Sequence, residues 1–123
     1  PQYVFIGKFL PESGYDMMNQ AIEKLGENLP QAFFAANDAI ALGALRSLNE
    51  HKISVPDRVS LISFNDTSLA KYAFPSLSAV KVFTEEMGAV AARMLIDGLN
   101  EEISVPQMAT LATCLIERDS SIN

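Results

Sequence analysis

The chain of 123 residues has the length of one domain, which excludes a multi-domain machine or a long repeat array within it. Apolar residues make up 49% and charged residues 20%, so the chain carries enough apolar material for a packed core and disorder is not expected. The 15 acidic residues exceed the 9 basic ones and give a net charge of -6, which excludes a basic surface that would hold DNA unaided.

The first quarter of the chain predicts a strand and then a helix. Residues 3–9 form an apolar run typical of a strand. Ser13, with Asp16 three residues later, predicts a helix start. An apolar helical face follows and ends near Gly26; it consists of Met17, Met18, Ala21, Ile22 and Leu25.

Two segments that resemble each other organise the middle of the chain. Residues 32–38 (AFFAAND) and 59–66 (VSLISFND) are continuous apolar runs that end in Asn-Asp. Such runs are typical of strands covered on both faces of a parallel sheet. Residues 39–51 between them have helical periodicity, and Asn37 or Asp38 can cap that helix. The pattern predicts a strand–helix–strand unit with parallel strands.

The second half adds two strands and a long helix. Pro56 ends the preceding helix, residues 67–74 are short helical or irregular structure, and residues 77–82 are a strand. Thr84 caps a helix that ends near Gly98, and residues 108–117 form the last strand. The order predicts an α/β fold of αβα layers, with helices on both faces of a parallel sheet.

Ligands of such sheets bind where strands end at their carboxyl edge. Five side chains close or follow a predicted strand there: Phe9, Asn37, Asp38, Asn65 and Asp66. Amides and carboxylates offer donors and acceptors for a ligand rich in hydroxyls, such as a sugar, and an aromatic ring covers its apolar face. The alternative is that each Asn-Asp pair is only a helix cap or turn, and one residue of a pair can cap while its neighbour faces a ligand.

Motifs of catalysis are missing from the sequence. It contains no nucleophile elbow, phosphate-binding loop, dinucleotide fingerprint or zinc-protease motif. His51 is the only histidine and is expected to be solvated, and Cys114 lies in an apolar strand as a small core residue. Asp38 and Asp66 are conceivable as paired acids of a small α/β enzyme, without a third acid or a phosphate cradle beside them. We expect no enzyme activity, no metal and no cofactor.

The single cysteine favours a reducing, cytoplasmic location, since it cannot form an internal disulfide. No apolar run approaches the ~20 residues that a membrane-spanning helix needs. The chain also starts with Pro1 directly before a predicted strand, which suggests a piece of a longer protein.

Several residues add apolar surface that one small sheet does not cover, and they indicate either a partner surface or the remainder of the core. They are Leu42, Gly43, Leu45 and Arg46 in the middle helix, with Leu69, Tyr72 and Phe74 after the second Asn-Asp pair.

Nearly the whole chain resembles the LacI/GalR family of bacterial sugar-responsive transcriptional repressors. The resemblance lies in AFFAANDAIALGALRSLNEHKISVPDRVSLISFNDTSLAKYAFPSLSAV, in TEEMGAVAARMLIDGL and in LATCLIERDSS. The Phe-Asn-Asp turn and the Thr-Glu-Glu-Met-Gly run look most like repressors of β-galactosidase operons.

The resemblance implies a partial type I periplasmic-binding-protein-like lobe. Residues 1–83 and 108–119 would belong to the carboxyl-terminal lobe, and residues 84–107 would cross to the amino-terminal lobe. The DNA-binding headpiece would lie outside this chain. The helix of the crossing segment would then repack on the remaining sheet or exchange with another copy.

Residues carried over from the family define an effector site and a dimer surface. Asn37 matches an effector-contacting asparagine, Phe9 matches an aromatic residue that lies against the sugar, and Asn65 stands where the family usually has an aspartate. Val82 and Thr84 occupy places where other members have pocket residues. The elements that carry Leu42, Arg46 and Tyr72 resemble the dimer surface.

These features lead to one main function hypothesis. The chain is the sugar-binding and homodimerisation part of a cytoplasmic LacI-type regulator, which contacts operator DNA only through the headpiece and contacts no membrane. The alternative is a sugar-binding protein of a transport or chemotaxis system with the same fold.

Overall fold

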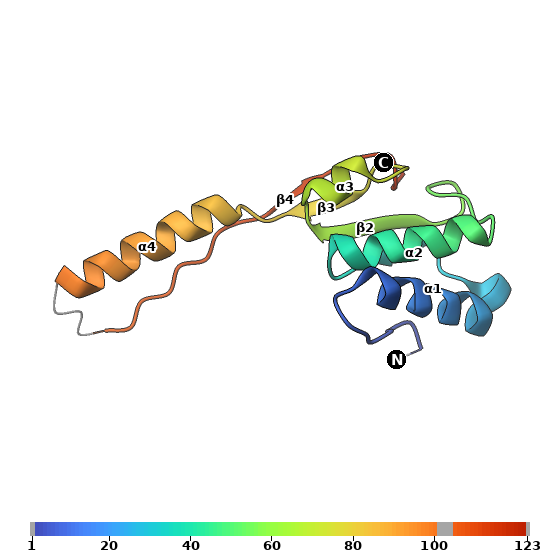
Figure 1. The fold of residues 1–123 in the computed structure, drawn as a ribbon, viewed down its shortest axis with the longest axis horizontal. Coiled ribbons are helices and arrows are strands. Elements are labelled where there is room, and N and C mark those ends of the chain that lie inside the picture. The colour runs from blue at the N-terminus through green and yellow to red at the C-terminus, as the bar shows by residue number, and fades with distance from the viewer. Residues whose placement is uncertain (1, 101–104, 123) are drawn as a thin grey trace.

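The computed structural model describes residues 2–100 and 105–122 and divides into a body and an arm (Figure 1). The body contains α1 (Pro11–Leu25), the short 3-10 helix η1 (Gly26–Asn28), β1 (Ala32–Phe34), α2 (Asp38–Glu50), β2 (Ser60–Asn65), α3 (Ser68–Tyr72) and β3 (Ser78–Lys81). The arm contains α4 (Thr84–Asn100), and β4 (Cys114–Ile116) returns the chain to the body.

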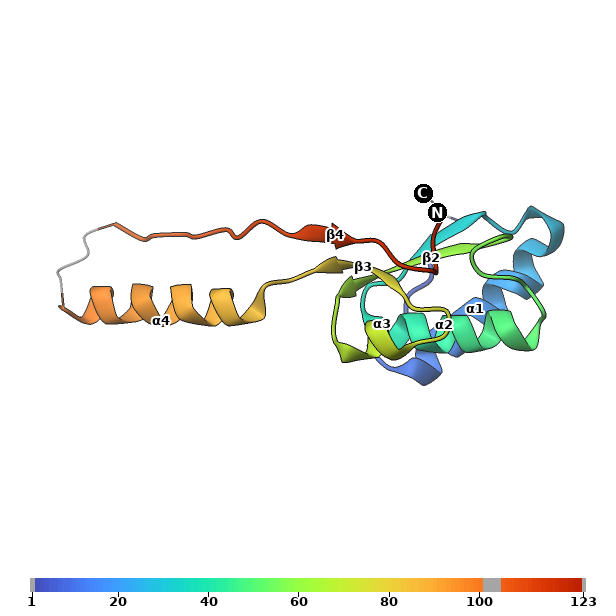
Figure 2. The same ribbon diagram turned by 90° about the horizontal axis from the view of Figure 1, so that it is seen from above.

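The four strands form one mixed sheet in the order β1-β2-β3-β4. The first three strands are parallel, and β4 joins the edge of β3 in the antiparallel direction. The α/β class and the parallel strand–helix–strand unit of the sequence analysis are confirmed. Figure 2 shows α2 and α3 along one face of this sheet, where the sequence predicted helices on both faces.

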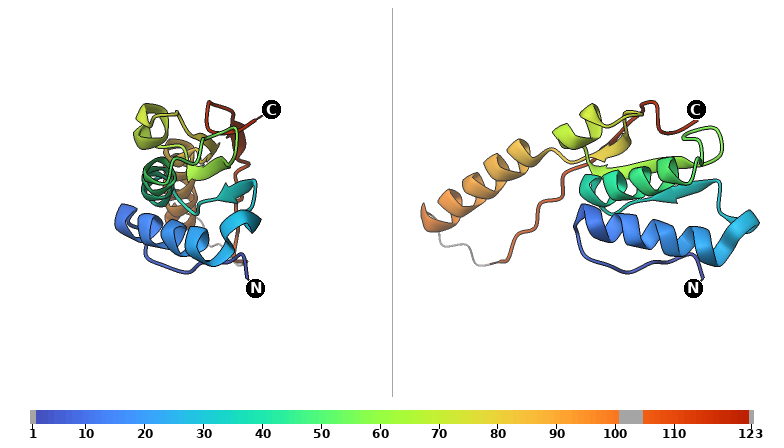
Figure 3. Two further views of the ribbon diagram at one scale, coloured as in Figure 1. Left: turned by 90° about the vertical axis from the view of Figure 1, so that its right-hand side faces the viewer. Right: turned by 45° about the vertical axis from the view of Figure 1, so that its right-hand side comes forward.

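The core lies between β2, β3 and the helix layer, and its most buried apolar side chains are Leu48, Val59, Leu61 and Leu77. Helix α1 packs mainly on α2 rather than on the sheet (Figure 3). Gly14 and Gly43 permit this close approach, because a Cβ on Gly14 would collide with the carbonyl oxygen of Ile40 and a Cβ on Gly43 with that of Pro11.

The predicted first strand is wrong. Residues 3–9 are irregular and join no strand of the sheet. The backbone N–H of Lys8 donates instead to the hydroxyl of Ser13, at 2.9 Å. Ser13 is therefore not the helix cap: Leu10 takes the cap position and Pro11 opens the first turn, where its missing N–H costs nothing. The predicted end of this helix at Gly26 is confirmed by its positive φ of 50°.

The last strand is much shorter than the predicted 108–117. Its pairing stops at Lys81 opposite Cys114, because β3 ends there and the chain soon enters α4. Helix α4 begins at Thr84 itself and does not repack on the sheet of its own chain. Residues 105–113 run back beside it (Figure 2). Among the described residues, no helix is long and apolar enough to cross a membrane.

Candidate functional site

The carboxyl ends of β1 and β2 lie at one edge of the sheet, because the two strands are parallel neighbours. The chain leaves β1 through Ala35, whose N–H donates to the carbonyl oxygen of Ile62. Asn37 then caps α2: its Oδ1 accepts from the N–H of Ile40 at 2.8 Å. The amide NH₂ of Asn37 takes no part in this cap and makes no hydrogen bond to another described residue.

Asp38 ties the two Asn-Asp segments together. Its side chain is 2% exposed, and its carboxylate accepts from the hydroxyl of Ser63 in β2 at 2.5 Å and from the N–H of Thr67 at 2.6 Å. Both of its oxygens are therefore engaged by the segment around the second Asn-Asp pair. The start of α2 and the end of β2 lie side by side at a shared rim.

The second pair forms a turn with unusual backbone geometry. Asn65 has a φ of 102° and Asp66 a φ of 58°, in the left-handed region that asparagine and aspartate tolerate better than most residues. The carboxylate of Asp66 lies 2.7 Å from Nη2 of Arg118, which follows β4. This contact is an ion pair without hydrogen-bond alignment, since Asp66 Oδ1 has no hydrogen-bond partner among the described residues. The other guanidinium nitrogen of Arg118 donates to the carbonyl oxygen of Leu77 at 2.7 Å.

The two pairs thus show the same division of roles. The aspartate of each pair is buried or nearly so and is bound by other residues of the chain. The side chain of Asn65 makes no hydrogen bond within the described residues, and Asn37 uses only its oxygen. Two amides are left with free hydrogen-bonding groups at one rim.

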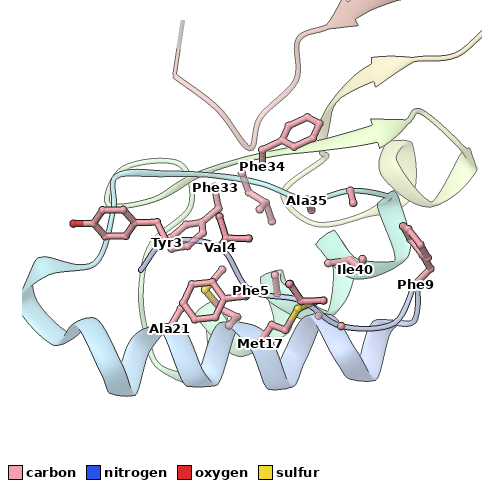
Figure 4. A pocket seen from close by; sticks show the side chains of 17 residues that line it. Tyr3, Val4, Phe5, Phe9, Met17, Ala21, Phe33, Phe34, Ala35 and Ile40 are labelled. Carbon is pink, nitrogen blue, oxygen red and sulfur yellow. The ribbon is translucent and has the colours of Figure 1, made fainter. Parts of the chain in front are cut away.

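Phe9 lies at the same end of the molecule. It lines an apolar cavity of about 380 Å³ between residues 3–9, α1 and β1, together with Ala36 and Ile40 beside Asn37 (Figure 4). Phe9 is 68% exposed, so neighbouring residues do not enclose it. The rest of the cavity is lined almost wholly by apolar side chains and does not suit a ligand covered in hydroxyls.

Three residues that the sequence did not single out hold the rim in place: Ser63, Thr67 and Arg118. Ser63 and Thr67 donate hydrogen bonds to the carboxylate of Asp38, and Arg118 forms an ion pair with Asp66. The N–H of Val82 donates to the carbonyl oxygen of Asn65 at 3.3 Å, which places Val82 beside that turn. Arg118 comes from a distant part of the chain, and the antiparallel pairing of β4 and the hydrogen bonds of the Arg118 backbone to Ser78 bring it close.

The residues assigned to the dimer surface lie on α2 and α3, which contact each other. Leu42 and Arg46 line a groove of about 470 Å³ between α1 and α2. Tyr72 is 79% exposed, and Phe74, just after α3, is 91% exposed. These two aromatic side chains therefore add exposed apolar surface rather than completing the core.

Arg46 also belongs to a small polar network. It forms an ion pair with Glu50 at 2.9 Å and lies over the ring of Tyr15, whose hydroxyl donates to the other Glu50 oxygen at 2.5 Å. The hydrogen bond from Tyr15, followed by that from Arg46, holds the pKa of Glu50 below its usual value. This network links α1 to α2 on the outer side of the body.

Comparison with known proteins identifies the family. Residues 3–121 match the sequence family of the periplasmic binding protein-like domain. The chain belongs to this family. It is 48% identical over 122 residues to the HTH-type transcriptional regulator GalR of Lacticaseibacillus casei and 46% identical over 121 residues to that of Streptococcus thermophilus. These matches cover 99% and 98% of this chain but only 37% and 36% of the two relatives.

A solved structure agrees with these matches. The transcriptional regulator CelR in complex with cellobiose superimposes with a TM-score of 0.86 at 33% identity, over 93% of this chain and 34% of that one. The resemblance to LacI/GalR regulators and the α/β fold of this domain are confirmed. The chain spans about a third of the length of the regulators it matches.

Proposed function

We propose that the chain is the sugar-binding and dimerisation part of a LacI-type transcriptional regulator of the cytoplasm. The observation that carries the proposal is the pair of free amides on Asn37 and Asn65, held at one rim by Asp38. A sugar that binds two arrangements of the intact protein with different affinity shifts the balance between them. A coupling of about 1 to 3 kcal/mol is sufficient to change operator affinity.

The chemistry of the rim fits a saccharide. The amide of Asn65 both donates to and accepts from sugar hydroxyls, and Asn37 donates through its NH₂ while its oxygen caps α2. Phe9 supplies an exposed ring for the apolar face of a pyranose. The two aspartates keep the amides in place rather than contact the ligand, because their carboxylates are already bound.

Residues 84–107 would cross to a second lobe, with residues 1–83 and 108–119 in this one. The exposure of α4 supports this assignment, since none of its described residues is buried in the chain itself. Leu95, Ile96 and Leu99 are more than half exposed and would lie against that second lobe. Operator DNA would be contacted by a headpiece outside this chain.

The same geometry argues against a catalytic role. An acid–base pair needs at least one carboxylate free to exchange a proton with substrate. Asp38 is bound by Ser63 and Thr67, and Asp66 faces the guanidinium of Arg118. The matched relatives are named as transcriptional regulators, which also disfavours a sugar-binding protein of a transport or chemotaxis system.

Titration calorimetry of the intact protein with a panel of galactosides and glucosides tests the sugar site. Asn65→Ala should weaken the tightest ligand by about 1 to 3 kcal/mol, because a buried ligand hydroxyl loses its partner. Asn37→Asp keeps an oxygen for the cap but removes the NH₂ donors, so it should lose affinity while the protein still folds, as thermal unfolding would show. Wild-type affinity in both variants would remove the two amides from the site.

We also propose that Leu42, Arg46 and Tyr72 contribute to a homodimer surface. The 79% exposure of Tyr72 and the groove beside Leu42 and Arg46 support this assignment. Sedimentation of the intact protein should show a dimer that Tyr72→Asp weakens, since a charge would be buried at the interface. The surface is misassigned if the variant sediments as the wild type does at every concentration.

A further inference from the structure

The turn after β2 is costly to hold. Asn65 and Asp66 are consecutive non-glycine residues with positive φ, at 102° and 58°. Each such residue costs about 1 to 3 kcal/mol and persists only where contacts of the surrounding structure offset that cost. The position of the Asn65 amide at the rim therefore depends on the contacts that retain this turn.

Contacts from two directions retain it. On one side, Asp38 accepts from the N–H of Thr67. On the other, the guanidinium of Arg118 lies 2.7 Å from the Asp66 carboxylate and donates to Leu77 just before β3. The side chains of Arg118 and Asp66 are only 18% and 8% exposed, so water screens their attraction far less than at a surface pair.

Arg118 itself is fixed at its backbone. Its N–H donates to the hydroxyl of Ser78 at 2.8 Å, and its carbonyl oxygen accepts from the same hydroxyl at 3.1 Å. The residue follows β4, which returns from the arm that carries α4. A side chain from the returning segment thus reaches the turn that presents Asn65.

We propose that Arg118 is a positioning residue for the sugar site: through Asp66 it fixes the backbone turn that directs the amide of Asn65 to the rim. The inference rests on the proposed sugar-binding function. Arg118 does not touch the ligand and acts only through Asp66. Its contribution is to hold the left-handed turn in the geometry that ligand binding requires, so that binding does not have to order it.

Two substitutions in the intact protein remove the ion pair in different ways. Arg118→Met keeps much of the aliphatic stem without the charge. Asp66→Asn removes the opposite charge, and asparagine accepts a φ of 58° as readily as aspartate, so the substitution itself adds no backbone strain to the turn. Ser76→Ala is the matched control: it removes the hydrogen bond from Ser76 to Asp119 in the same returning segment, without touching the rim.

Hydrogen exchange of the Val82 amide reports on the turn without any ligand. This N–H donates to the carbonyl oxygen of Asn65. Its exchange should become at least about tenfold faster in Arg118→Met and Asp66→Asn, and stay unchanged in Ser76→Ala. Unchanged exchange in Asp66→Asn would overturn the proposal.

Calorimetry with the tightest sugar of the panel gives the second measurement. Both variants should bind about tenfold more weakly than Ser76→Ala. The double variant should bind no more weakly than Arg118→Met alone, because Asp66→Asn breaks only the ion pair that Arg118→Met has already removed. Independent losses, or affinities within about twofold of the control, would overturn the proposal. If the wild type binds no sugar of the panel, the proposed function fails, while the Val82 exchange still decides whether Arg118 holds the turn.

Discussion

The bridge from Asp38 to Ser63 and Thr67 joins the two segments of the rim, and its removal is the sharpest test of the geometry. In Asp38→Ala the buried hydroxyl of Ser63 loses its acceptor, and so does the N–H of Thr67. The unsatisfied buried hydroxyl costs about 1 to 3 kcal/mol, and the N–H of Thr67, which is only part-buried, adds about 1 kcal/mol. The free energy of unfolding of the intact protein should therefore fall by about 2 to 4 kcal/mol.

A double-mutant cycle separates the hydrogen bond between Asp38 and Ser63 from other effects of the Asp38 carboxylate, such as its favourable interaction with the N-terminus of α2. Ser63→Ala should cost about 1 to 2 kcal/mol, because one buried carboxylate oxygen loses its donor. The double variant Asp38→Ala/Ser63→Ala should be more stable than the sum of the single losses predicts, by about 1 kcal/mol or more. Replacing both partners by apolar groups leaves no polar group unpaired at that position.

Urea unfolding followed by circular dichroism measures all four proteins of the cycle. The m-value should stay constant, so that a shift of the midpoint reports stability alone. Strictly additive losses would show that Asp38 and Ser63 do not interact as described. A loss below about 0.5 kcal/mol for Asp38→Ala would show that the carboxylate is solvated, and the shared rim would lose its main support.

Two further predictions concern the contact of α1 with α2. Gly43→Ala should destabilise the protein by about 1 to 3 kcal/mol in thermal unfolding, because its Cβ would meet the backbone oxygen of Pro11, whereas Gly88→Ala, with open space around it, should not. The hydrogen bond from Tyr15, followed by that from Arg46, lowers the pKa of Glu50 in the folded state. The ionised Glu50 side chain therefore stabilises the fold above the ordinary carboxyl pKa of 4.5, and this stabilisation is lost as the pH falls through the lowered pKa of the folded state. Tyr15→Phe should move the pKa of Glu50 upward in an NMR titration, and an unchanged titration curve would contradict the hydrogen bond.

Local patterns in the sequence were sufficient for the middle of the chain. The two apolar runs that end in Asn-Asp became the parallel neighbours β1 and β2, and the periodic segment between them became α2, which Asn37 caps. Each of these elements is decided by neighbours in sequence or by one strand pairing. The rule that parallel strands end at one edge then correctly predicts that the two Asn-Asp pairs lie together.

The failures occurred where the structure depends on distant partners. Residues 3–9 and 108–113 are apolar or β-prone, but a strand exists only where another strand supplies a ladder. Residues 3–9 pair with no strand, and β3 is too short to pair with the returning segment beyond residues 114–116. Periodicity also does not show which of two adjacent polar residues turns inward. The aspartate of each pair turns inward because it binds Ser63 or Arg118, and these partners lie 25 and 52 residues away from it in the sequence.

Asp38 and Asp66 bind other residues of the chain, whereas Asn37 and Asn65 keep free hydrogen-bonding groups. This difference also explains why an amide suits position 65. The rim already contains the carboxylates of Asp38 and Asp66, and Arg118 is the cation that contacts it among the described residues. A carboxylate at position 65 would add a third negative charge beside them, and like charges at short range oppose one another. An asparagine keeps the acceptor, adds two donors and tolerates a φ of 102°. It also presents the ligand with a neutral group, so the sugar contact at this position depends on the orientation of the turn more than on charge.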